Sequence, residues 1–489
     1  MIRPSLNEAE KLASGYSIVP ISMEIFSDVK TPIEVLKNIS ERSSRYYLLE
    51  SIENGEKWGR YSFLGFDPIA KLVCKDGKIT FDSGISICEE TQTPNDSIRK
   101  ILEQYKSPRI SYLPPFTGGF VGYFSYDYAK YAEPTLKLNA KDDFDFADCE
   151  LLLFDKIIVY DQLRQKIILI CNIKTDHLEA NYNRAIVELN NMADMIYETM
   201  EHHHVTGRVN SPFVPQKTEK QFAAMVENIR AHIKEGDIFQ AVASNRYTAD
   251  FEGSMLPVYR LLRTINPSPY MIYFKCGDLE IAGSSPETLV SLQDGELGTY
   301  PLAGSRPRGK NEKEDKSLEK ELLTDEKELS EHNMLVDLGR NDLGKVSRFG
   351  SVELSDYLRV LRYSHIMHIS SHVTGKLKKD KDPLDVISAM LPAGTLSGAP
   401  KKRAMEILDE LENSRRGIYG GAIGYIDFTG NMDLCIAIRM AVKKDGKVHV
   451  QAGAGIVEGS VPEKEYVEVQ NKARAVMEAL ERAEEAQER

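Results

Sequence analysis

Strand-like and helix-like stretches follow one another along this chain in an irregular order. Two neighbouring apolar runs of strand length, "CELLLFDKIIVYD" and "KIILICNI", suggest a buried hairpin. Further on, Thr218 and Gln221 form a capping box that opens an apolar stripe of helical period. Because strands and helices do not alternate as regular β-α-β units, the pattern favours an α+β fold over a doubly wound one. We expect large antiparallel or mixed sheets packed against helices.

Capping residues and turn dipeptides mark where individual elements begin and end. Thr31, Pro32 and Glu34 fit the N-cap, the first helical position and the capping box of a helix near the N-terminus. A closing helix is expected to run from Pro462 toward Leu480. Turn dipeptides separate the expected strands at Asn54-Gly55, Asp67-Pro68, Asp76-Gly77 and Asp445-Gly446.

The segment 201–217 divides the chain, because it interrupts the periodicity and contains two prolines. We interpret it as the main linker, between an N-terminal region over 1–205 and a second region over 218–489. Three consecutive histidines at 202–204 invite interpretation as a metal site. Consecutive side chains do not converge on one ion, so an exposed loop is favoured.

Composition and charge limit the classes of partner. The chain has 489 residues and a formal net charge of −12, which argues against nucleic-acid and anionic-membrane partners because repulsion opposes both. No apolar run approaches membrane-spanning length and the N-terminal stretch has no leader-like apolar segment, so we expect a cytoplasmic protein. The cysteines form no C-x-x-C pair, which is typical of free thiols in a reducing compartment. They are Cys74, Cys88, Cys149, Cys171, Cys276 and Cys435.

A charged helix follows a small-residue stretch in "QAGAGIVEGSVPEKEYVEVQNKA" (451–473). Glu465, Glu468 and Lys472 stand at i, i+3 and i+7, so their side chains share one helical face. The same spacing also suits a solvated face stabilised by ion pairs. From these residues alone both a ligand site and a surface face remain open.

The glycines before that helix, Gly453 and Gly455, resemble a dinucleotide loop only superficially. Gly459 is one position too late for G-x-G-x-x-G, and no β-α-β unit surrounds the stretch. Small residues here can expose backbone N–H groups to a carboxylate, or can mark a bulge or a tight corner.

A second acidic helix lies in "LTDEKELSEHNMLVDLGRND", where Glu328 and Glu331 are three residues apart. Carboxylates from two helices, with water and an anionic ligand, would suit Mg²⁺, a hard ion that takes few protein oxygens. Four turns rich in small residues accompany these helices and suit recognition of small carboxylates, although each alone fits a surface turn. They are "GSSPE" (283–287), "PLAGSRPRG" (301–309), "GTLSGAPK" (394–401) and "RRGIYGG" (415–421).

These motifs, with "IMH" (366–368), "CIAIR" (435–439) and "NKARA" (471–475), stand in the order seen in chorismate-utilising enzymes. The chain resembles most the anthranilate synthase component I branch of that family. The N-terminal half resembles it through "YYLLES" and "GRYSFLG". The resemblance implies two interlocked regions, a regulatory one over 1–205 and a chorismate-binding catalytic one over 218–489. It implies Mg²⁺-dependent conversion of chorismate and ammonia to anthranilate and pyruvate, the first step of tryptophan biosynthesis.

The resemblance also assigns roles to residues by motif. Glu331 and Glu468 match the carboxylates that bind Mg²⁺. His368 matches the family's catalytic histidine, associated with the elimination of pyruvate. Glu328 and Ser305 match further catalytic positions, and Glu465 a polar position around the site. The matches to the groups that bind chorismate are Gly304, Ser305, Tyr419, Arg439, Gly453, Ala454, Gly455 and Lys472.

Ala303 separates the branches of the family. Aminodeoxychorismate synthases resemble this chain but typically carry at that position a lysine that adds to the ring, and alanine has no such nucleophile. Aminodeoxychorismate synthase component I remains the alternative, with isochorismate-forming enzymes more distant. Ser305 stands where the family usually has threonine, so the hydroxyl is kept and a methyl that restricts its rotamer is lost.

The resemblance further implies a partner and an inhibitor. No glutaminase motif is visible in the chain, so ammonia is expected from a separate glutamine amidotransferase subunit. Glu50 and Ser51, with Pro269, Tyr270 and Met271, match the family's L-tryptophan inhibitor site; a rigid proline loop is the alternative for the latter three. An alternative from a different functional class is a non-catalytic regulatory subunit that binds tryptophan.

Overall fold

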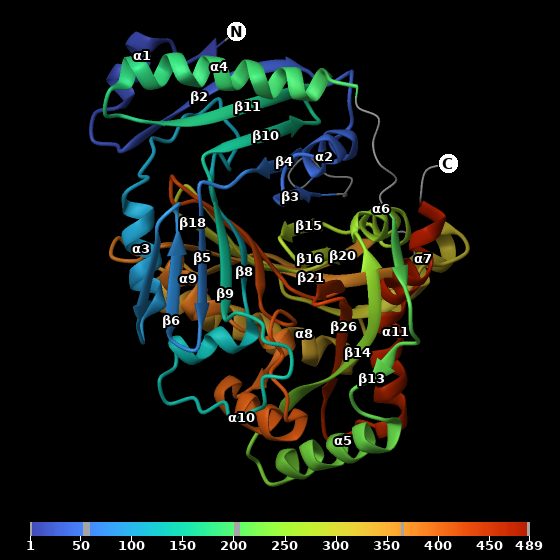
Figure 1. The fold of residues 1–489 in the computed structure, drawn as a ribbon. Helices are drawn as coiled ribbons and strands as arrows, with labels where there is room; N and C mark the ends of the chain where they lie inside the picture. Colours follow the sequence, from blue (N-terminus) through green and yellow to red (C-terminus); the bar gives the residue numbers. More distant parts are fainter. Residues whose placement is uncertain (1, 52–58, 200–205, 363–365, 487–489) are drawn as a thin grey trace.

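The computed structural model describes residues 2–51, 59–199, 206–362 and 366–486. Two large antiparallel sheets lie face to face, and helices cover their outer surfaces (Figure 1). This arrangement confirms the α+β class. Within the described residues, no helix combines the length and the hydropathy that crossing a bilayer requires.

The first sheet has 14 strands among the described residues, and β13 (Val214–Pro215) and β22 (Gly398–Ala399) add to its strand β14. The order of the others is β1 (Ile2–Arg3), β2 (Ile18–Phe26), β11 (Lys166–Lys174), β10 (Lys156–Asp161), β4 (Tyr61–Phe66), β3 (Arg45–Glu50), β15 (Tyr270–Cys276), β16 (Leu279–Ser285), β25 (Met440–Lys444), β26 (Lys447–Ile456), β14 (Gln240–Gly253) and β12 (Gly207–Val209).

The second sheet has 12 strands among the described residues, and β20 (Glu353–Arg362) pairs with its strand β21. The order of the others is β19 (Leu302–Pro307), β21 (Ile366–Lys376), β18 (Glu296–Thr299), β17 (Thr288–Gln293), β24 (Met432–Ile436), β23 (Ala422–Asp427), β8 (Gly119–Phe124), β9 (Cys149–Phe154), β5 (Ala70–Lys75), β6 (Lys78–Asp82) and β7 (Ser86–Glu90).

Each sheet takes strands from both halves of the chain. In the first sheet β3 pairs with β15, where Glu50 lies opposite Met271. In the second sheet β8 pairs with β23, where Gly122 lies opposite Gly424. The halves are therefore interlocked through two continuous sheets. The division into regions at 205 and 218 stays a prediction.

Three apolar layers hold the molecule together. One lies between the sheets and includes Tyr47, Phe154 and Ile423. The second lies under α1 (Leu6–Leu12), α2 (Pro32–Ser40), α4 (Leu178–Tyr197), α5 (Glu219–Lys234), α6 (Leu256–Ile265), α10 (Lys401–Glu412) and α11 (Pro462–Glu481). The third lies under α3 (Pro94–Glu103), α8 (Glu326–Val346) and α9 (Pro383–Met390), and α7 (Glu312–Leu322) packs on β19. In Figure 1, α4 crosses β2 and β11 at the top of the view.

Most of the predicted caps and turns are present. Thr31 caps α2 and Thr218 caps α5, each with a capping box. Asp76-Gly77 and Asp445-Gly446 connect β5 to β6 and β25 to β26. Pro462 opens α11, and all six cysteines are free thiols. The Asn54-Gly55 turn and the three histidines at 202–204 lie outside the described residues.

The expected hairpin between residues 149–161 and 166–173 is confirmed for the second half of the first run and wrong for its first half. Only β10 pairs with β11, whereas β9 pairs with β5 and β8 in the other sheet. The chain changes sheet at Asp155, whose carbonyl accepts hydrogen bonds from the backbone and side-chain nitrogens of Asn172 at 2.8 and 3.0 Å. Both strands are buried on both faces, so their apolar pattern does not distinguish one sheet from two.

Candidate active site

Lys472 joins helix α11 to the first sheet. Its Nζ donates to the carbonyl oxygen of Gly453 on β26 at 3.0 Å and lies 2.8 Å from a carboxylate oxygen of Glu468, one helical turn earlier. The predicted shared face of α11 therefore points toward the glycines of β26. This side of α11 forms one wall of the site.

Carboxylates from α8 and α11 face the same space. Burial raises the pKa of Glu331, and the charges of Glu328 and Glu468 add to that rise. Lys472 partly opposes it. On α11, burial raises the pKa of Glu465, with a further contribution from Glu468. Burial is thus the main reason why these carboxyl groups resist ionisation, and their mutual repulsion adds to it.

This donor set fits a small, hard divalent cation. Carboxylate oxygens of Glu331 and Glu468 come from two helices, and such ions favour a few carboxylates with water and ligand oxygens completing the shell. A bound cation would oppose both burial and the repulsion from Glu328 and Glu468, which together raise the pKa of Glu331. Glu468 already pairs with Lys472, so a cation would share or take over that carboxylate.

A second acidic group, at the end of α5, has its potential ligand atoms within 4.8 Å of one another: His232, Glu235 and Asp237. One oxygen of Asp237 already lies 2.9 Å from His232 Nδ1 and 3.1 Å from an Arg403 nitrogen. The guanidinium supplies the positive charge there, so this surface group is a poor metal site.

His368 and Gly304 meet where β21 pairs with β19. His368 Nδ1 lies 3.2 Å from the carbonyl oxygen of Gly304. Because a carbonyl only accepts, Nδ1 carries the proton and Nε2 is the basic nitrogen. Burial lowers the pKa of His368 to about 4; the Gly304 bond opposes that shift, and Arg439 and Lys472 reinforce it. The imidazole is therefore neutral at neutral pH.

Gly304 has a left-handed backbone (φ +78°), and a Cβ atom there would lie 3.1 Å from Glu328 Oε2. The irregularity of β19 at this position thus brings Gly304, whose carbonyl oxygen contacts His368, close to Glu328. Glu328 also lies 3.1 Å from Arg306, which compensates its charge. Ser305, opposite His368 in the strand pairing, is exposed.

The bulge or tight corner considered for Gly453 and Gly455 is absent, because Gly453, Ala454 and Gly455 all lie inside strand β26 and pair with β14 without a register shift. Close approach by side chains explains the glycines instead. A Cβ at Gly453 would lie 2.8 Å from the Tyr419 hydroxyl, and one at Gly455 would lie 2.4 Å from Gln240 Nε2. The predicted site residue Tyr419 therefore sits directly over Gly453.

Arg439 lies near the same space. It has a left-handed backbone (φ +52°), uncommon for a residue with a Cβ, and its carbonyl accepts from the backbone N–H of Ser284 at 3.1 Å. Its charge acts on both His368 and Glu287. Arg439 and Lys472 thus form a cationic side of the site.

Glu287, the last residue of "GSSPE", is a site residue that sequence analysis missed. It is buried, and the hydroxyl of Thr395 donates to its carboxyl group at 3.1 Å. Burial raises its pKa to about 7, while Thr395, Arg439 and Lys472 oppose the rise. A carboxyl group in a run of small residues before an apolar strand was the available signal.

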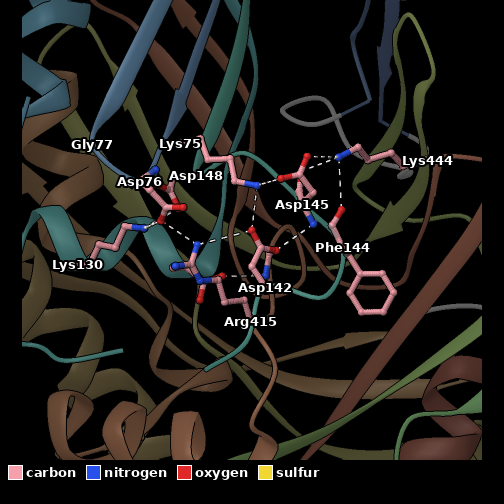
Figure 2. Close-up of polar contacts among 12 residues, drawn as sticks. Lys75, Asp76, Gly77, Lys130, Asp142, Phe144, Asp145, Asp148, Arg415 and Lys444 are labelled. Atoms are coloured by element: carbon pink, nitrogen blue, oxygen red, sulfur yellow. Dashed lines mark hydrogen bonds and ion pairs between the residues drawn. The ribbon is translucent and has the colours of Figure 1, made fainter. Parts of the chain in front are cut away.

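The loop that carries Tyr419 is anchored to the N-terminal half by charged side chains (Figure 2). Arg415 pairs with Asp76, at the turn between β5 and β6, at 2.8 Å and with Asp142 at 3.7 Å. Lys75 pairs with Asp142 at 2.9 Å. Both halves of the chain therefore hold this part of the site.

Arg416 of that loop forms a buried ion pair at 2.6 Å with Glu412, the last residue of α10, and the two side chains are 2% and 5% exposed. Arg416 also donates to the carbonyl oxygens of Leu396 and Val242, each at 2.6 Å. Its guanidinium lies 5.8 Å from the centre of the Tyr419 ring. The pair links three segments that border the site.

A separate cavity of about 710 Å³ lies between the sheets. All five residues predicted for an inhibitor site line it: Glu50, Ser51, Pro269, Tyr270 and Met271. Asp433 also lines it, and burial raises the pKa of Asp433 to about 7 while the Tyr270 hydroxyl opposes the rise.

The sequence of the chain is similar to a family profile and to individual proteins that agree with one another. A profile described as chorismate binding enzyme matches residues 44–478. The anthranilate synthase component 1 of Acetivibrio thermocellus is 44% identical over 495 residues, with 99% of each chain covered. That of Aquifex aeolicus is 44% identical over 493 residues, again with 99% of each covered.

Solved structures are similar as well. The anthranilate synthase component I from Streptococcus pneumoniae TIGR4 has a TM-score of 0.73 and 35% identity, covering 92% of this chain and 98% of that one. The menaquinone-specific isochorismate synthase of Escherichia coli has a TM-score of 0.71 at 18% identity, covering 98% of this chain and 100% of that one. At that identity the likeness concerns the fold.

Proposed function

The chain belongs to the chorismate-binding enzymes and is a homologue of anthranilate synthase component I, and on that premise we propose that its residues convert chorismate and ammonia to anthranilate and pyruvate. The observation that carries this proposal is the convergence of two kinds of group. Carboxylates of α8 and α11 share one space, and a neutral histidine and a buried carboxyl group respond to the same two cations.

Chorismate carries two carboxylates, which need cationic partners. We assign one to Arg439 and Lys472, whose charges reach both His368 and Glu287. The other would bind Mg²⁺ held by Glu331 and Glu468. When bound, Mg²⁺ would neutralise that carboxylate and withdraw electron density from the ring, which assists departure at C4.

Glu287 is suited to donate a proton. Ammonia forms a bond to ring C2, the double bonds shift, and the C4–oxygen bond breaks. The leaving hydroxyl takes the Glu287 proton and departs as water. A pKa raised to about 7 keeps a large fraction of this carboxyl group protonated near neutral pH.

His368 is suited to the second step. Its Nε2 accepts the proton from ring C2, the electrons of that C–H bond form the aromatic ring, and the bond from the ring to the enolpyruvyl oxygen breaks. The released enolpyruvate takes a proton at its methylene carbon and becomes pyruvate. The Gly304 carbonyl fixes the tautomer that this role needs.

We further propose that ammonia comes from a separate glutamine amidotransferase subunit and that the cavity between the sheets binds L-tryptophan as an inhibitor. Support for the second point is the gathering of Glu50, Ser51 and Tyr270 around one cavity. Glu50 is held there by Tyr259 at 2.7 Å and Arg263 at 2.9 Å. We expect the enzyme to work in the cytoplasm.

Ala303 supports anthranilate over aminodeoxychorismate as the product. It is buried in β19 opposite Ile369, where its methyl group offers no nucleophile to the ring. Aminodeoxychorismate synthase component I stays the alternative enzyme. A non-catalytic, tryptophan-binding subunit is the alternative of another class.

The test is a product assay with purified protein, chorismate, Mg²⁺ and ammonium. Anthranilate fluorescence that requires both Mg²⁺ and ammonium is the expected result. Aminodeoxychorismate in place of anthranilate would establish the alternative enzyme. Tryptophan binding without any turnover of chorismate would establish the non-catalytic subunit.

A further inference from the structure

A chain of hydroxyl groups leads from the cavity between the sheets to the candidate active site. Asp433 and Tyr270 line that cavity, and the Tyr270 hydroxyl lies 2.9 Å from Asp433 Oδ1. The same hydroxyl lies 2.9 Å from Oγ1 of Thr288. Thr288 directly follows Glu287 in the chain. The two sites are thus one residue and two hydrogen bonds apart.

The backbone around Glu287 is held on the side toward β24. The N–H of Ile436 donates to the Glu287 carbonyl at 3.0 Å, and the Ser285 hydroxyl donates to the Ile436 carbonyl at 2.7 Å. Immediately afterwards the pairing of β17 with β24 shifts register between Thr288 and Val290. Thr288 itself lies opposite Cys435, so regular pairing is interrupted directly after it, and its side chain supplies a further restraint at that point.

We propose that Tyr270 and Thr288 are positioning residues for Glu287, so that the occupant of the inter-sheet cavity controls the placement of the proton donor. The inference rests on the proposed function of Glu287 and adds the route by which the two sites are coupled. The Tyr270 hydroxyl donates to Asp433, so while that bond is made the Thr288 hydroxyl is the donor toward the Tyr270 oxygen. A ligand that takes either Asp433 or the Tyr270 hydroxyl changes the bond to Thr288.

This coupling works in both directions. A ligand shifts a conformational equilibrium by its differential affinity for the two states. If the cavity occupant favours the arrangement in which Thr288 has moved, chorismate and the occupant weaken each other's binding by the same factor. That reciprocity makes the route measurable from either site.

The experiment replaces Thr288 with valine, which keeps the shape and removes the hydroxyl, and with serine, which keeps the hydroxyl. With ammonium, Mg²⁺ and chorismate, Thr288→Val should lower kcat about 10-fold, the effect of one lost hydrogen bond, and change KM less than about 2-fold. Thr288→Ser should keep most of kcat. Thr175→Val is the matched control, because Thr175 donates to the carbonyl oxygens of Tyr16 and Ser17, far along the chain from both sites.

The coupling itself is measured by calorimetry with L-tryptophan as the probe, with and without chorismate and Mg²⁺. In Thr288→Val the ratio of the two dissociation constants should fall toward one, while the probe still binds. Tyr270→Phe removes the same link from the other end and should give the same fall, which covers a Thr288 variant that does not fold.

Two results would overturn the inference. One is an unchanged kcat and an unchanged coupling ratio in both Thr288→Val and Tyr270→Phe. The other is Thr288→Ser as impaired as Thr288→Val, since the shape of the side chain and not its hydroxyl would then matter. If the wild-type protein makes no anthranilate, the proposed function fails by itself, and the ratio of binding constants still decides the coupling.

Discussion

Lys472 and Glu468 form an ion pair at 2.8 Å on one face of α11, and the same ammonium group donates to the carbonyl oxygen of Gly453 on β26. The lysine is therefore fixed by two acceptors from different elements. If a divalent cation takes the Glu468 carboxylate, Lys472 keeps its Gly453 bond and turns its charge toward the substrate. One ion pair would then connect metal binding with recognition of chorismate.

Replacing Glu468 with glutamine tests this connection. Glu468→Gln keeps the shape and removes the charge, so the Mg²⁺ concentration for half-maximal activity should rise by at least about 10-fold, the lower end of what losing even a supporting group costs a metal site. Activity is titrated with Mg²⁺ at saturating ammonium. Glu478→Gln on the same helix, which removes a surface pair with Arg482, is the control. Equal Mg²⁺ dependence in both variants would refute the ligand role.

Replacing Glu287 with glutamine tests the proton donor. The amide still accepts the Thr395 hydrogen bond but offers no acidic proton, so kcat should fall about 100- to 10,000-fold, the usual contribution of acid catalysis. KM for chorismate should change much less. Single-turnover formation of anthranilate measures the effect. A variant with nearly normal kcat would remove Glu287 from the mechanism.

The same carboxyl group makes stability depend on pH. Its pKa is raised from 4.5 to about 7 in the folded protein by burial, so its stabilising effect is complete below pH 4.5 and is lost as the pH rises to 7. The loss amounts to about 3 kcal/mol at most. Urea unfolding of wild type and Glu287→Gln should therefore show the variant gaining relative stability between pH 5 and pH 8. A constant difference would mean that Glu287 is not held as an acid.

Ser51 tests the cavity between the sheets. Among the described residues its hydroxyl oxygen is buried and has no hydrogen-bond partner, so it is available to a ligand. Ser51→Phe should fill part of the cavity and abolish L-tryptophan binding, and Ser51→Ala should weaken it by about 10-fold for one lost hydrogen bond. Ammonia-dependent turnover should remain largely intact in both. Undiminished inhibition in Ser51→Phe would place the inhibitor elsewhere.

Arg416 tests the buried ion pair beneath Tyr419. Arg416→Met leaves Glu412 buried without its partner and should lower the free energy of unfolding by about 3–5 kcal/mol. The double variant with Glu412→Leu removes both charges and should recover part of that loss. Denaturant unfolding of the three proteins gives the comparison. No recovery in the double variant would show that the links to Leu396 and Val242 dominate.

Local signals along the chain predicted local structure well. The capping boxes at Thr31 and Thr218 and the turns at Asp76-Gly77 and Asp445-Gly446 depend on neighbouring residues, and all four are present. The face shared by Glu468 and Lys472 also followed from helical spacing. Each of these patterns can be recognised from a few neighbouring residues, without knowledge of the rest of the chain.

Features that depend on distant parts of the chain were predicted less well. The change of sheet at Asp155 was missed, because the apolar sequence of a strand that is buried on both faces does not indicate to which sheet the strand belongs. For the glycines of β26 we considered an anion-binding loop, a bulge or a corner, whereas the close approach of Tyr419 and Gln240 explains them. Glu287 was missed because its environment comes from Thr395, Arg439 and Lys472, all distant in sequence.

The strand pairs that connect the two halves of the chain affect how the protein folds while it is synthesised on the ribosome. β3 and β8 emerge early, but their partners β15 and β23 belong to the part translated later. Until then each nascent sheet presents an unpaired strand edge, a template for wrong pairing between chains. Slow translation of the second half prolongs that interval. Recovery of folded enzyme from an expression host is therefore expected to depend on the supply of chaperones.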